Sequence, residues 1–226
     1  MTTPYRWAER DRALVASFVE RVRPLLAGTV RHIFDLGSRD CAEAVALAAA
    51  FPEATVHAFE ANPAQWAACY GTANRFGDGR VRVVPAAVSH MDGYVDLYEA
   101  DVLNSSSKDW PDGNPGASSL FPSAIEAEPS KVPSWRLDTY CVEHGITHVD
   151  IVWADIQGAE LLALQGMGAV AFDVLHTEVV HTPFYRGGTS FAELDGWLRG
   201  RGFRRMAEPR WDHGEEDLDY VHERVL

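Results

Sequence analysis

The fold is decided by residues 29–60, which read TVRHIFDLGSRDCAEAVALAAAFPEATVHAFE. Two short runs rich in β-branched and aromatic residues, TVRHIFDLG and ATVHAFE, predict buried strands that end at Gly37 and Glu60. The alanine-rich stretch from Cys41 to Phe51 predicts the helix that joins them. A strand, a helix and a second strand in this order indicate parallel strands connected by a right-handed crossover.

The same alternation continues on both sides of this stretch. An amphipathic helix is predicted from Ala8 to Leu26, within an N-terminal segment 1–28. Further expected elements are a helix to about Phe76, a strand from Val81 to Ser89, a strand over 149–155, a helix opening at Gly158, a strand from Phe172 to Val180, a helix over 190–202 and two short strands within 203–226. Pro85 predicts an edge or a bend in the third strand, because proline lacks an N–H for pairing. The predicted fold is therefore α/β, a doubly wound and mostly parallel sheet in a single domain, 1–226.

Residues 101–134 differ from the rest of the chain, because they are rich in Ser, Pro, Gly and Asp and lack periodicity. A loop of this length is usually functional or disordered. We expect it to form a lid over the ligand that shapes the acceptor pocket, with Trp110, Phe121 and Trp135 as anchors.

The composition restricts the partners of the protein. The 226 residues include 20 Lys and Arg against 33 Asp and Glu, so the formal net charge is −13. Binding to nucleic acid is disfavoured, because it depends mostly on basic side chains. The three cysteines include no C-x-x-C pair, and no apolar run approaches a membrane span of roughly 18 residues. We therefore expect a cytoplasmic protein that binds a small molecule and no membrane, as a monomer or, given Trp7 and its helix, a homodimer.

Ligands of such sheets bind beyond the carboxyl ends of the strands, which here carry acidic residues. The glycine pattern G-x-G-x-x-G of dinucleotide sites is missing, since only Gly37 is present, and a phosphate-binding G-x-x-x-x-G-K-[ST] loop is absent. What remains is Asp35, two residues before Gly37, and Glu60 at the end of the second strand. A carboxylate at Glu60 can accept both hydroxyls of a ribose, so the pattern favours a nucleoside without a diphosphate, and S-adenosylmethionine is the commonest one.

Several motifs in order make a family resemblance specific. These are FDLGSRDCAEAVALAAAFPEATVHAFEANP, GASSL, SWRLDTY and VDIVWADIQGAELLALQGMG. Together they resemble the FkbM-type methyltransferases, a family of class I S-adenosylmethionine-dependent enzymes, over roughly residues 30–205. The most specific part is D-I-Q-G-A-E-L-x-x-L-x-G, which begins at Asp155. The resemblance implies a Rossmann-like class I methyltransferase fold and methylation of hydroxyls on sugars, polyketides or other specialised metabolites.

The resemblance also implies roles for individual residues. It assigns Asp35 and Gly37, with the adjoining Ser38, to the methionine end of the cofactor. It assigns Glu60, with the adjoining Ala61, to the ribose. The adenine would lie near Ala86 and Ala87, and Asp155 would face both the transferred methyl and the acceptor.

Two departures from the family pattern bear on the chemistry. Many members have Lys two residues before the aspartate and Glu two residues after it, whereas this chain has Trp153 and Gln157. A hydroxyl is a weak nucleophile and benefits from a general base. The candidates for this base are His181, Glu178 and Asp155, in that order.

Three questions stay open at this point. Asp155 and Glu178 offer part of an oxygen-rich site, so a divalent metal is uncertain. The changes at Trp153 and Gln157 leave room for a non-catalytic cofactor-binding or interaction protein on the same fold. A nucleotide-binding oxidoreductase is the less favoured alternative, because the glycines are missing.

Overall fold

The computed structural model describes residues 6–99, 116–122, 128–209 and 214–226, with side chains from residue 10 onward. The helices are α1 (Arg6–Val22), α2 (Ala42–Ala50), α3 (Trp66–Phe76), α4 (Leu137–His144), α5 (Glu160–Gln165) and α6 (Phe191–Arg199), with the 3₁₀ turns η1 (Arg23–Leu25) and η2 (Glu223–Val225). The strands are β1 (His32–Leu36), β2 (Thr55–Phe59), β3 (Val81–Val84), β4 (Ala87–Ser89), β5 (Gly93–Leu97), β6 (Ser130–Arg136), β7 (His148–Ala154), β8 (Ala171–Val180), β9 (Phe203–Arg205) and β10 (Glu215–His222).

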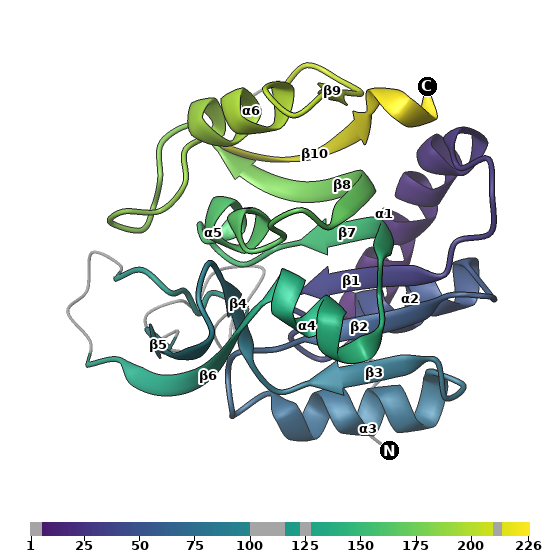
Figure 1. Cartoon of the computed structure of the whole chain (residues 1–226). Helices are drawn as coiled ribbons and strands as arrows, with labels where there is room; N and C mark the ends of the chain where they lie inside the picture. The colour runs from purple at the N-terminus through teal and green to yellow at the C-terminus, as the bar shows by residue number, and fades with distance from the viewer. Residues whose placement is uncertain (1–5, 100–115, 123–127, 210–213) are drawn as a thin grey trace.

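The main sheet has the strand order β3-β2-β1-β7-β8-β10-β9 (Figure 1). Its first five strands are parallel, and β10 pairs antiparallel with both β8 and β9. Leu36 pairs with Phe59 on one side and with Ala154 on the other, so β1, β2 and β7 end at the same level. The strand order reverses between β1 and β7, which is the position where sheets of this type bind their ligands. The predicted α/β fold with a mostly parallel sheet is confirmed.

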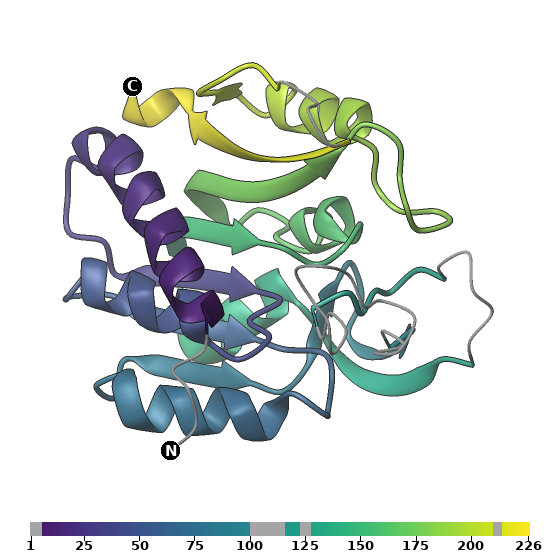
Figure 2. The same ribbon diagram turned by 180° about the vertical axis from the view of Figure 1, so that it is seen from behind.

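Helices cover both faces of this sheet (Figures 1 and 2). Side chains alternate between the two faces along each strand, so that Phe34 packs toward α4, α5 and α6 while Ile33 packs toward α1, α2 and α3. Figure 2 shows α1 lying across the sheet beside α2. Phe18 of α1 is fully buried and contacts the ring of Trp153 at a centroid distance of 5.3 Å. Burial of one such aromatic side chain contributes about 1.5–3 kcal/mol, so α1 is part of the core.

A polar network also attaches α1 to the sheet. Arg21 Nε donates to Asp219 Oδ2 at 2.6 Å, and the other oxygen of Asp219 lies 2.7 Å from Nδ1 of His176. His176 in turn stacks on Trp153 at 3.8 Å between ring centroids. Buried charges require such partners, because an unpaired charge in the interior is costly. The network therefore fixes α1 against β8 and β10.

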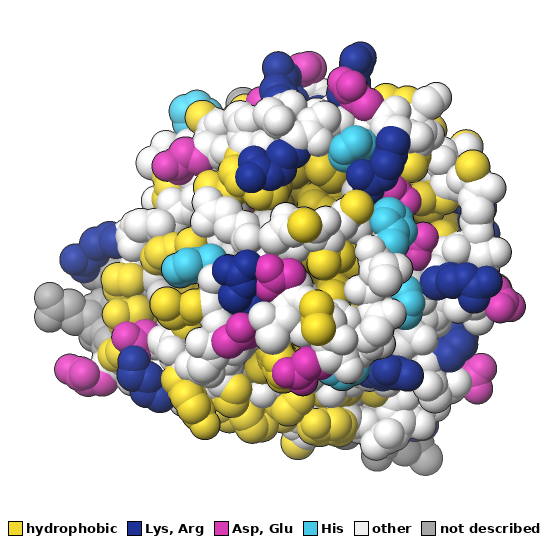
Figure 3. Space-filling view, viewed as in Figure 1, with side chains coloured by type: hydrophobic (Ala, Val, Ile, Leu, Met, Phe, Trp, Pro, Cys, Tyr) yellow, Lys and Arg dark blue, Asp and Glu magenta, His cyan; other side chains and the backbone are white. Residues whose placement is uncertain are grey.

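A second sheet of order β4-β6-β5 lies beyond the carboxyl ends of the parallel strands (Figure 1). It pairs β4 with β6 in parallel and β5 with β6 in antiparallel orientation. Figure 3 shows apolar side chains gathered over this region, where Met91 and Tyr94 are exposed, whereas basic side chains are scattered over that face. The small sheet closes one side of the edge at which the main strands end.

The structure corrects some predicted element boundaries. The strand predicted from Val81 to Ser89 is divided at Pro85 into the edge strand β3 and the separate strand β4, because proline cannot continue the pairing. The predicted loop 101–134 is wrong at its end, because residues 130–134 belong to β6. Strand β5 was not anticipated. Residues 101–115 and 123–127, with Trp110, lie outside the described residues.

The N-terminal helix is also shorter than predicted. The helix was predicted to run from Ala8 to Leu26, but the α-helix ends at Val22 and the chain continues in η1. It ends there because Pro24 lacks the N–H that a further helical turn would use. The helix predicted to open at Gly158 begins at Glu160, since Gly158 has a φ of +96°. Within the described residues, no helix combines the length and the apolar character needed to cross a bilayer.

Candidate active site

The turn after β1 approaches the end of β7 more closely than any side chain would permit. Gly37 has a φ of +88°, and a Cβ built on it would lie 2.0 Å from the carbonyl oxygen of Asp155. The backbone N–H groups of Gly37 and Ser38 both donate to the carbonyl oxygen of Phe59 at 2.9 Å. Only glycine meets both the steric and the conformational requirement at this position. The ends of β1, β2 and β7 are thereby joined into one edge.

Asp35 and Ser38 lie beneath this turn. Both are buried, and Ser38 Oγ donates to Asp35 Oδ2 at 2.5 Å. Burial raises the pKa of Asp35 to about 7, although the bond from Ser38 acts in the opposite direction. Neither side chain lines the pocket described below. Asp35 therefore supports this turn from behind. It does not cap α2, whose N-cap residue is Cys41 and has no side-chain capping bond.

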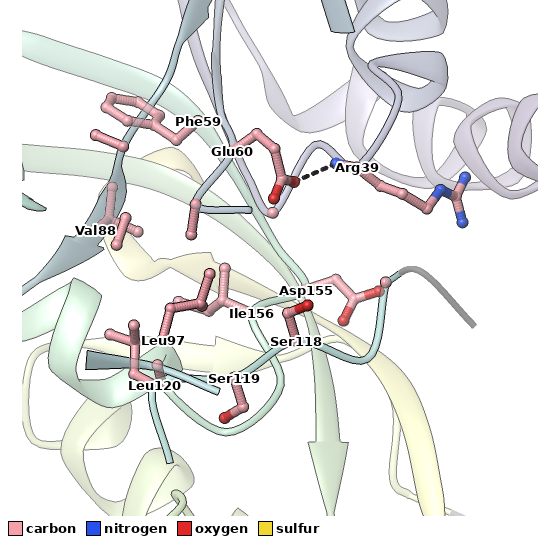
Figure 4. Close-up of a pocket in the computed structure, with 16 residues that line it drawn as sticks. Arg39, Phe59, Glu60, Val88, Leu97, Ser118, Ser119, Leu120, Asp155 and Ile156 are labelled. Carbon is pink, nitrogen blue, oxygen red and sulfur yellow. Dashed lines mark hydrogen bonds between the residues drawn. The ribbon is translucent and has the colours of Figure 1, made fainter. Parts of the chain in front are cut away.

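Two further residues of this turn have positive φ values, a backbone conformation that usually favours glycine. Arg39 and Cys41 have φ values of 50° and 62°. The guanidinium of Arg39 lies 2.8 Å from Asp11 Oδ2 and 3.4 Å from Glu43 Oε1, and in Figure 4 it points away from Glu60. Ion pairs therefore hold the turn in a conformation that glycines would adopt without strain.

Glu60, at the end of β2, holds the backbone around it through both of its oxygens. Oε2 accepts from the backbone N–H of Arg39 at 2.7 Å (Figure 4). Oε1 accepts from the backbone N–H of Asn62 at 2.6 Å. Burial raises the pKa of Glu60 to about 7, against the effect of these two bonds. A carboxylate has about four lone-pair sites, so each oxygen can accept one further donor from a ligand.

A pocket extends from Glu60 along the edge of the sheet. Its empty space, including the open mouth, is about 520 Å³, within the range of small-molecule sites. It is lined by Gly37, Arg39, Phe59, Glu60, Ala61, Ala86, Ala87, Val88, Leu97, Gly116, Ser118, Ser119, Leu120, Asp155, Ile156 and Ala159. Figure 4 shows Glu60, Asp155 and Ser118 toward one end, and Val88, Leu97 and Leu120 toward the other. The pocket is thus polar at one end and apolar at the other.

The structure brings together most of the predicted cofactor residues. Gly37, Glu60, Ala61, Ala86 and Ala87 all line this pocket, as does Asp155. The GASSL motif contributes Ser118, Ser119 and Leu120, although most of the predicted lid lies outside the described residues.

Some lining residues were not anticipated from the sequence. Leu97 belongs to β5, a strand that was not predicted, and Val88 is a lining residue because β4 leaves the main sheet after Pro85. The alternating run GYVDL at 93–97 was the signal for β5.

Beyond Asp155, a second group of polar side chains continues the site. The amide Nε2 of Gln157 donates to Asp155 Oδ1 at 2.7 Å and to Glu178 Oε2 at 3.1 Å. Burial raises the pKa of both Asp155 and Glu178. The pKa of Glu178 rises to about 9, because the negative charges of Asp155 and Glu215 add to the effect of burial. Asp155 remains open to solvent through the pocket, so a ligand that fills the pocket will strengthen this effect.

A smaller pocket lies on the far side of Gln157 from the cofactor pocket. It is lined by Gln157, Gly158, Glu178, Val180, Pro183, Phe184, Tyr185 and Gly188. Glu160, whose Oε1 accepts from the backbone N–H groups of Ile156 and Gly158 at 3.2 and 3.1 Å, stabilises the loop between the two pockets. Two adjacent pockets separated by carboxylates form a suitable site for a cofactor and an acceptor.

His181, the first candidate for the general base, is placed differently from Asp155 and Glu178. His181 is exposed, with Nδ1 3.4 Å from the hydroxyl of Thr182, and it lines neither pocket. His176 lies on a central strand, where it bonds Asp219. Trp153 is buried and stacks on His176.

A metal is not indicated at this site. Among the described residues, the group of His, Cys, Asp and Glu side chains close enough to share an ion is His148, Asp150 and Asp173. These residues lie at or near the amino ends of β7 and β8, at the opposite edge of the sheet. Asp150 there accepts backbone N–H groups, and Asp173 bonds His148 and Arg224.

The family of the chain follows from comparison with known proteins. The model of the methyltransferase FkbM domain matches residues 31–205. The chain belongs to the FkbM methyltransferase family. The cofactor of this family is S-adenosylmethionine, which confirms the predicted cofactor.

A curated relative and two solved structures extend this comparison. The chain is 27% identical over 160 residues to 2-O-methyltransferase NoeI of Sinorhizobium fredii, and the match covers 67% of the chain but only 60% of that relative. The fold resembles magnesium protoporphyrin IX methyltransferase from Synechocystis with bound SAM (TM-score 0.52, 10% identity, 99% of this chain and 87% of that one). It also resembles the N-terminal domain of EvdMO1 with SAH bound (TM-score 0.51, 11% identity, 94% and 80%). At these identities the structures show the fold alone.

The residues of the larger pocket fit S-adenosylmethionine. Gly37 leaves space where a Cβ would collide, the carboxylate of Glu60 is available to the two ribose hydroxyls, and the apolar end suits a flat aromatic base. Asp155 adds a negative charge near the sulfonium and ammonium groups of the methionine end.

Proposed function

We propose that this protein transfers a methyl group from S-adenosylmethionine to a hydroxyl of a small molecule. The observation that carries the proposal is the position of Asp155, which lines the cofactor pocket and is linked through Gln157 to Glu178 at the adjoining pocket. The chain is similar to the 2-O-methyltransferase NoeI, whose name supports a hydroxyl as the acceptor.

In this proposal the chain binds the cofactor through residues of the sheet edge. Glu60 accepts the ribose hydroxyls, Ala86 and Ala87 adjoin the adenine, and the turn at Gly37 adjoins the methionine end. When bound, S-adenosylmethionine supplies an electrophilic methyl group on a sulfonium. The contribution of the chain is to align the acceptor oxygen with that methyl, and alignment can supply a large part of the rate enhancement.

The proton of the acceptor hydroxyl requires a base, and we assign this role to Asp155. The pKa of Glu178, about 9, keeps that side chain protonated near neutral pH, so it donates a hydrogen bond instead of accepting a proton. Burial raises the pKa of Asp155 as well, although the bond from Gln157 acts against this shift. Asp155 is preferred as the base because it is the one of these two carboxyls that lines the cofactor pocket. The order of candidate bases thus becomes Asp155, then Glu178, with the exposed His181 last.

The experiment begins with calorimetric titration of S-adenosylhomocysteine and continues with radiolabelled S-adenosylmethionine and a panel of sugars, polyketides and phenols. We expect saturable cofactor binding, methyl transfer to at least one hydroxyl, and a loss of turnover of about 100-fold in Asp155→Asn with cofactor binding retained. Full activity of that variant would refute the role of Asp155. Cofactor binding without any transfer would favour a non-catalytic binding protein, and saturable binding of NADH an oxidoreductase.

The remaining expectations from the sequence complete the proposal. We propose a single domain that acts in the cytoplasm on a small molecule, as a monomer or homodimer, without nucleic acid. Light scattering of the purified protein distinguishes the two oligomeric states. An assay in the presence of a chelator tests metal dependence, and we expect unchanged turnover.

A further inference from the structure

Gln157 occupies an unusual position between two carboxyl groups. Its single amide nitrogen contacts Asp155 Oδ1 at 2.7 Å and Glu178 Oε2 at 3.1 Å. An amide NH₂ has two hydrogens, so it can donate one to each carboxyl group at the same time. By this geometry the two bonded oxygens are held within about 6 Å of each other, although they belong to different strand ends.

The other side of the same amide fixes its direction. The hydroxyl of Tyr185 lies 3.1 Å from Gln157 Oε1 and 2.8 Å from the carbonyl oxygen of Ala117. The tyrosine hydroxyl has one hydrogen, which these two acceptor oxygens share. An ionised carboxylate oxygen only accepts, so the amide nitrogen faces the carboxyl groups and the amide oxygen faces Tyr185. The reversed amide would place its oxygen against Asp155 and Glu178, with no hydrogen to offer them.

The backbone around Gln157 is held just as firmly. Gln157 has a φ of +55°, a conformation that costs about 1 kcal/mol or more for a residue with a side chain. Its carbonyl oxygen accepts from Ser119 Oγ at 2.7 Å, and the next carbonyl, of Gly158, accepts from the backbone N–H of Thr189 at 2.8 Å. Residues from two separate loops therefore stabilise this conformation.

Each of the two carboxyl groups has one oxygen left that can bind the substrate that receives the methyl group. Asp155 Oδ2 and Glu178 Oε1 have no hydrogen-bond partner among the residues that the structure describes. Glu178 faces Asp155, Glu160, Glu215 and Asp217, while Arg39 and His176 act on Asp155. Most of the charge around the pair is negative, so an anionic acceptor is disfavoured.

We propose that Gln157 is a positioning residue, oriented by Tyr185, which holds Asp155 and Glu178 as one unit whose two remaining oxygens bind two adjacent hydroxyls of an uncharged acceptor. This inference rests on the proposed function and specifies the acceptor class. In the family pattern many relatives have glutamate at this position, which would place a third carboxyl group between the two. The amide of Gln157 instead donates a hydrogen bond to each carboxyl group, where a third carboxylate would repel them.

The test compares Gln157→Met with wild type, because methionine has a similar volume and lacks the amide. Carboxyl groups are labelled with ¹³C and titrated by NMR, and the signals of Asp155 and Glu178 are assigned with Asp155→Asn and Glu178→Gln. We expect the pKa of Asp155 to rise in Gln157→Met, since the hydrogen bond that favours its ionised form is lost. Gln157→Glu should raise the pKa of both carboxyls, because it adds a like charge.

A matched control separates this effect from general damage. Gln165→Met makes the same chemical change at an exposed position of α5 and should leave both carboxyl pKa values unchanged. Tyr185→Phe removes only a hydroxyl, and we expect it to shift the pKa of Asp155 in the same direction as Gln157→Met. Gln157 does not line the cofactor pocket, so all these variants should bind S-adenosylhomocysteine within about twofold of wild type.

The outcomes distinguish this inference from the proposed function. Wild type that fails to bind S-adenosylhomocysteine would refute the proposed function. Normal cofactor binding with an unchanged pKa of Asp155 in both Gln157→Met and Tyr185→Phe would overturn the inference alone. For an acceptor that supports turnover, we expect kcat of Gln157→Met to fall about 10- to 100-fold and deoxy or phosphorylated analogues to bind more weakly. Equal binding of those analogues would overturn the assigned acceptor class.

Discussion

Replacement of Glu60 by glutamine removes a charge from the cofactor pocket while keeping the shape of the side chain. Burial raises the pKa of Glu60 to about 7, so roughly half of the unliganded protein carries this charge at neutral pH. Ribose hydroxyls donate best to the ionised carboxylate. Between pH 8 and pH 6 the ionised fraction falls from about nine-tenths to about one-tenth, so binding of S-adenosylhomocysteine should weaken about tenfold, or ~1.4 kcal/mol, through Glu60 alone.

At pH 8 the variant should bind the cofactor product more weakly than wild type. A hydrogen bond to a charged group contributes about 1.5–3 kcal/mol, which corresponds to about 10- to 150-fold in Kd. The amide of glutamine has one acceptor oxygen, whereas Glu60 now accepts the N–H groups of both Arg39 and Asn62. The loss therefore includes some distortion of the turn.

The assay is calorimetric titration of wild type, Glu60→Gln and Glu143→Gln at pH 6, 7 and 8. Glu143 is exposed on α4, so its variant removes the same net charge far from the described hydrogen bonds of the pocket. The ratio of Kd values between Glu60→Gln and wild type should shrink about tenfold from pH 8 to pH 6, because only wild type has a carboxyl at position 60 that titrates in this range. A ratio that is independent of pH, in a variant with a normal melting transition, would refute the reasoning.

Two further substitutions test the architecture. Gly37→Ala should abolish cofactor binding and lower the melting temperature, because its Cβ would lie 2.0 Å from the carbonyl oxygen of Asp155; a fully active variant would contradict this geometry. Asp219→Ala should cost about 2–3 kcal/mol in chemical denaturation, because Arg21 and His176 lose their partner. Burial acts to raise the pKa of Asp219, but the bonds from His176 and Arg21 outweigh it and lower the pKa below 3.8, so this cost should be full above pH 3.8 and vanish as the pH falls further.

The sequence predicted the main sheet because most of its strands are short runs of buried residues, and β1, β2 and β7 are each followed by a glycine or an acidic residue. The periodicity of TVRHIFDLG and VDIVWAD reports burial on both faces, and this is a local property of the chain. The small sheet was missed because its pairing is not local. Strand β6 follows a polar segment and contains Pro133, and it is a strand only because β4 and β5 lie on either side of it.

The site was predictable to a similar degree. Glu60 and Asp155 follow strands directly, so topology alone brings them to one edge. The contacts of Gln157 with Glu178 and Tyr185 join residues 21 and 28 positions apart, and they depend on how the loop after β8 folds back. His181 was ranked first as a base by its chemistry and its place after a strand, yet the direction of that loop leaves it exposed.

The position of β10 has a consequence for the order in which the molecule is assembled. This strand is made near the end of the described chain, but it lies inside the sheet between β8 and β9, and its Asp219 bonds Arg21, 198 residues away. During synthesis on a ribosome, β8 therefore presents an unpaired edge, and α1 lacks one of its attachments, until residue 222 has emerged. An open strand edge is a site for pairing with other chains. A nascent chain of this protein should consequently depend on chaperones late in translation, and mutations in β10 should reduce yield more than they reduce the activity of the molecules that fold.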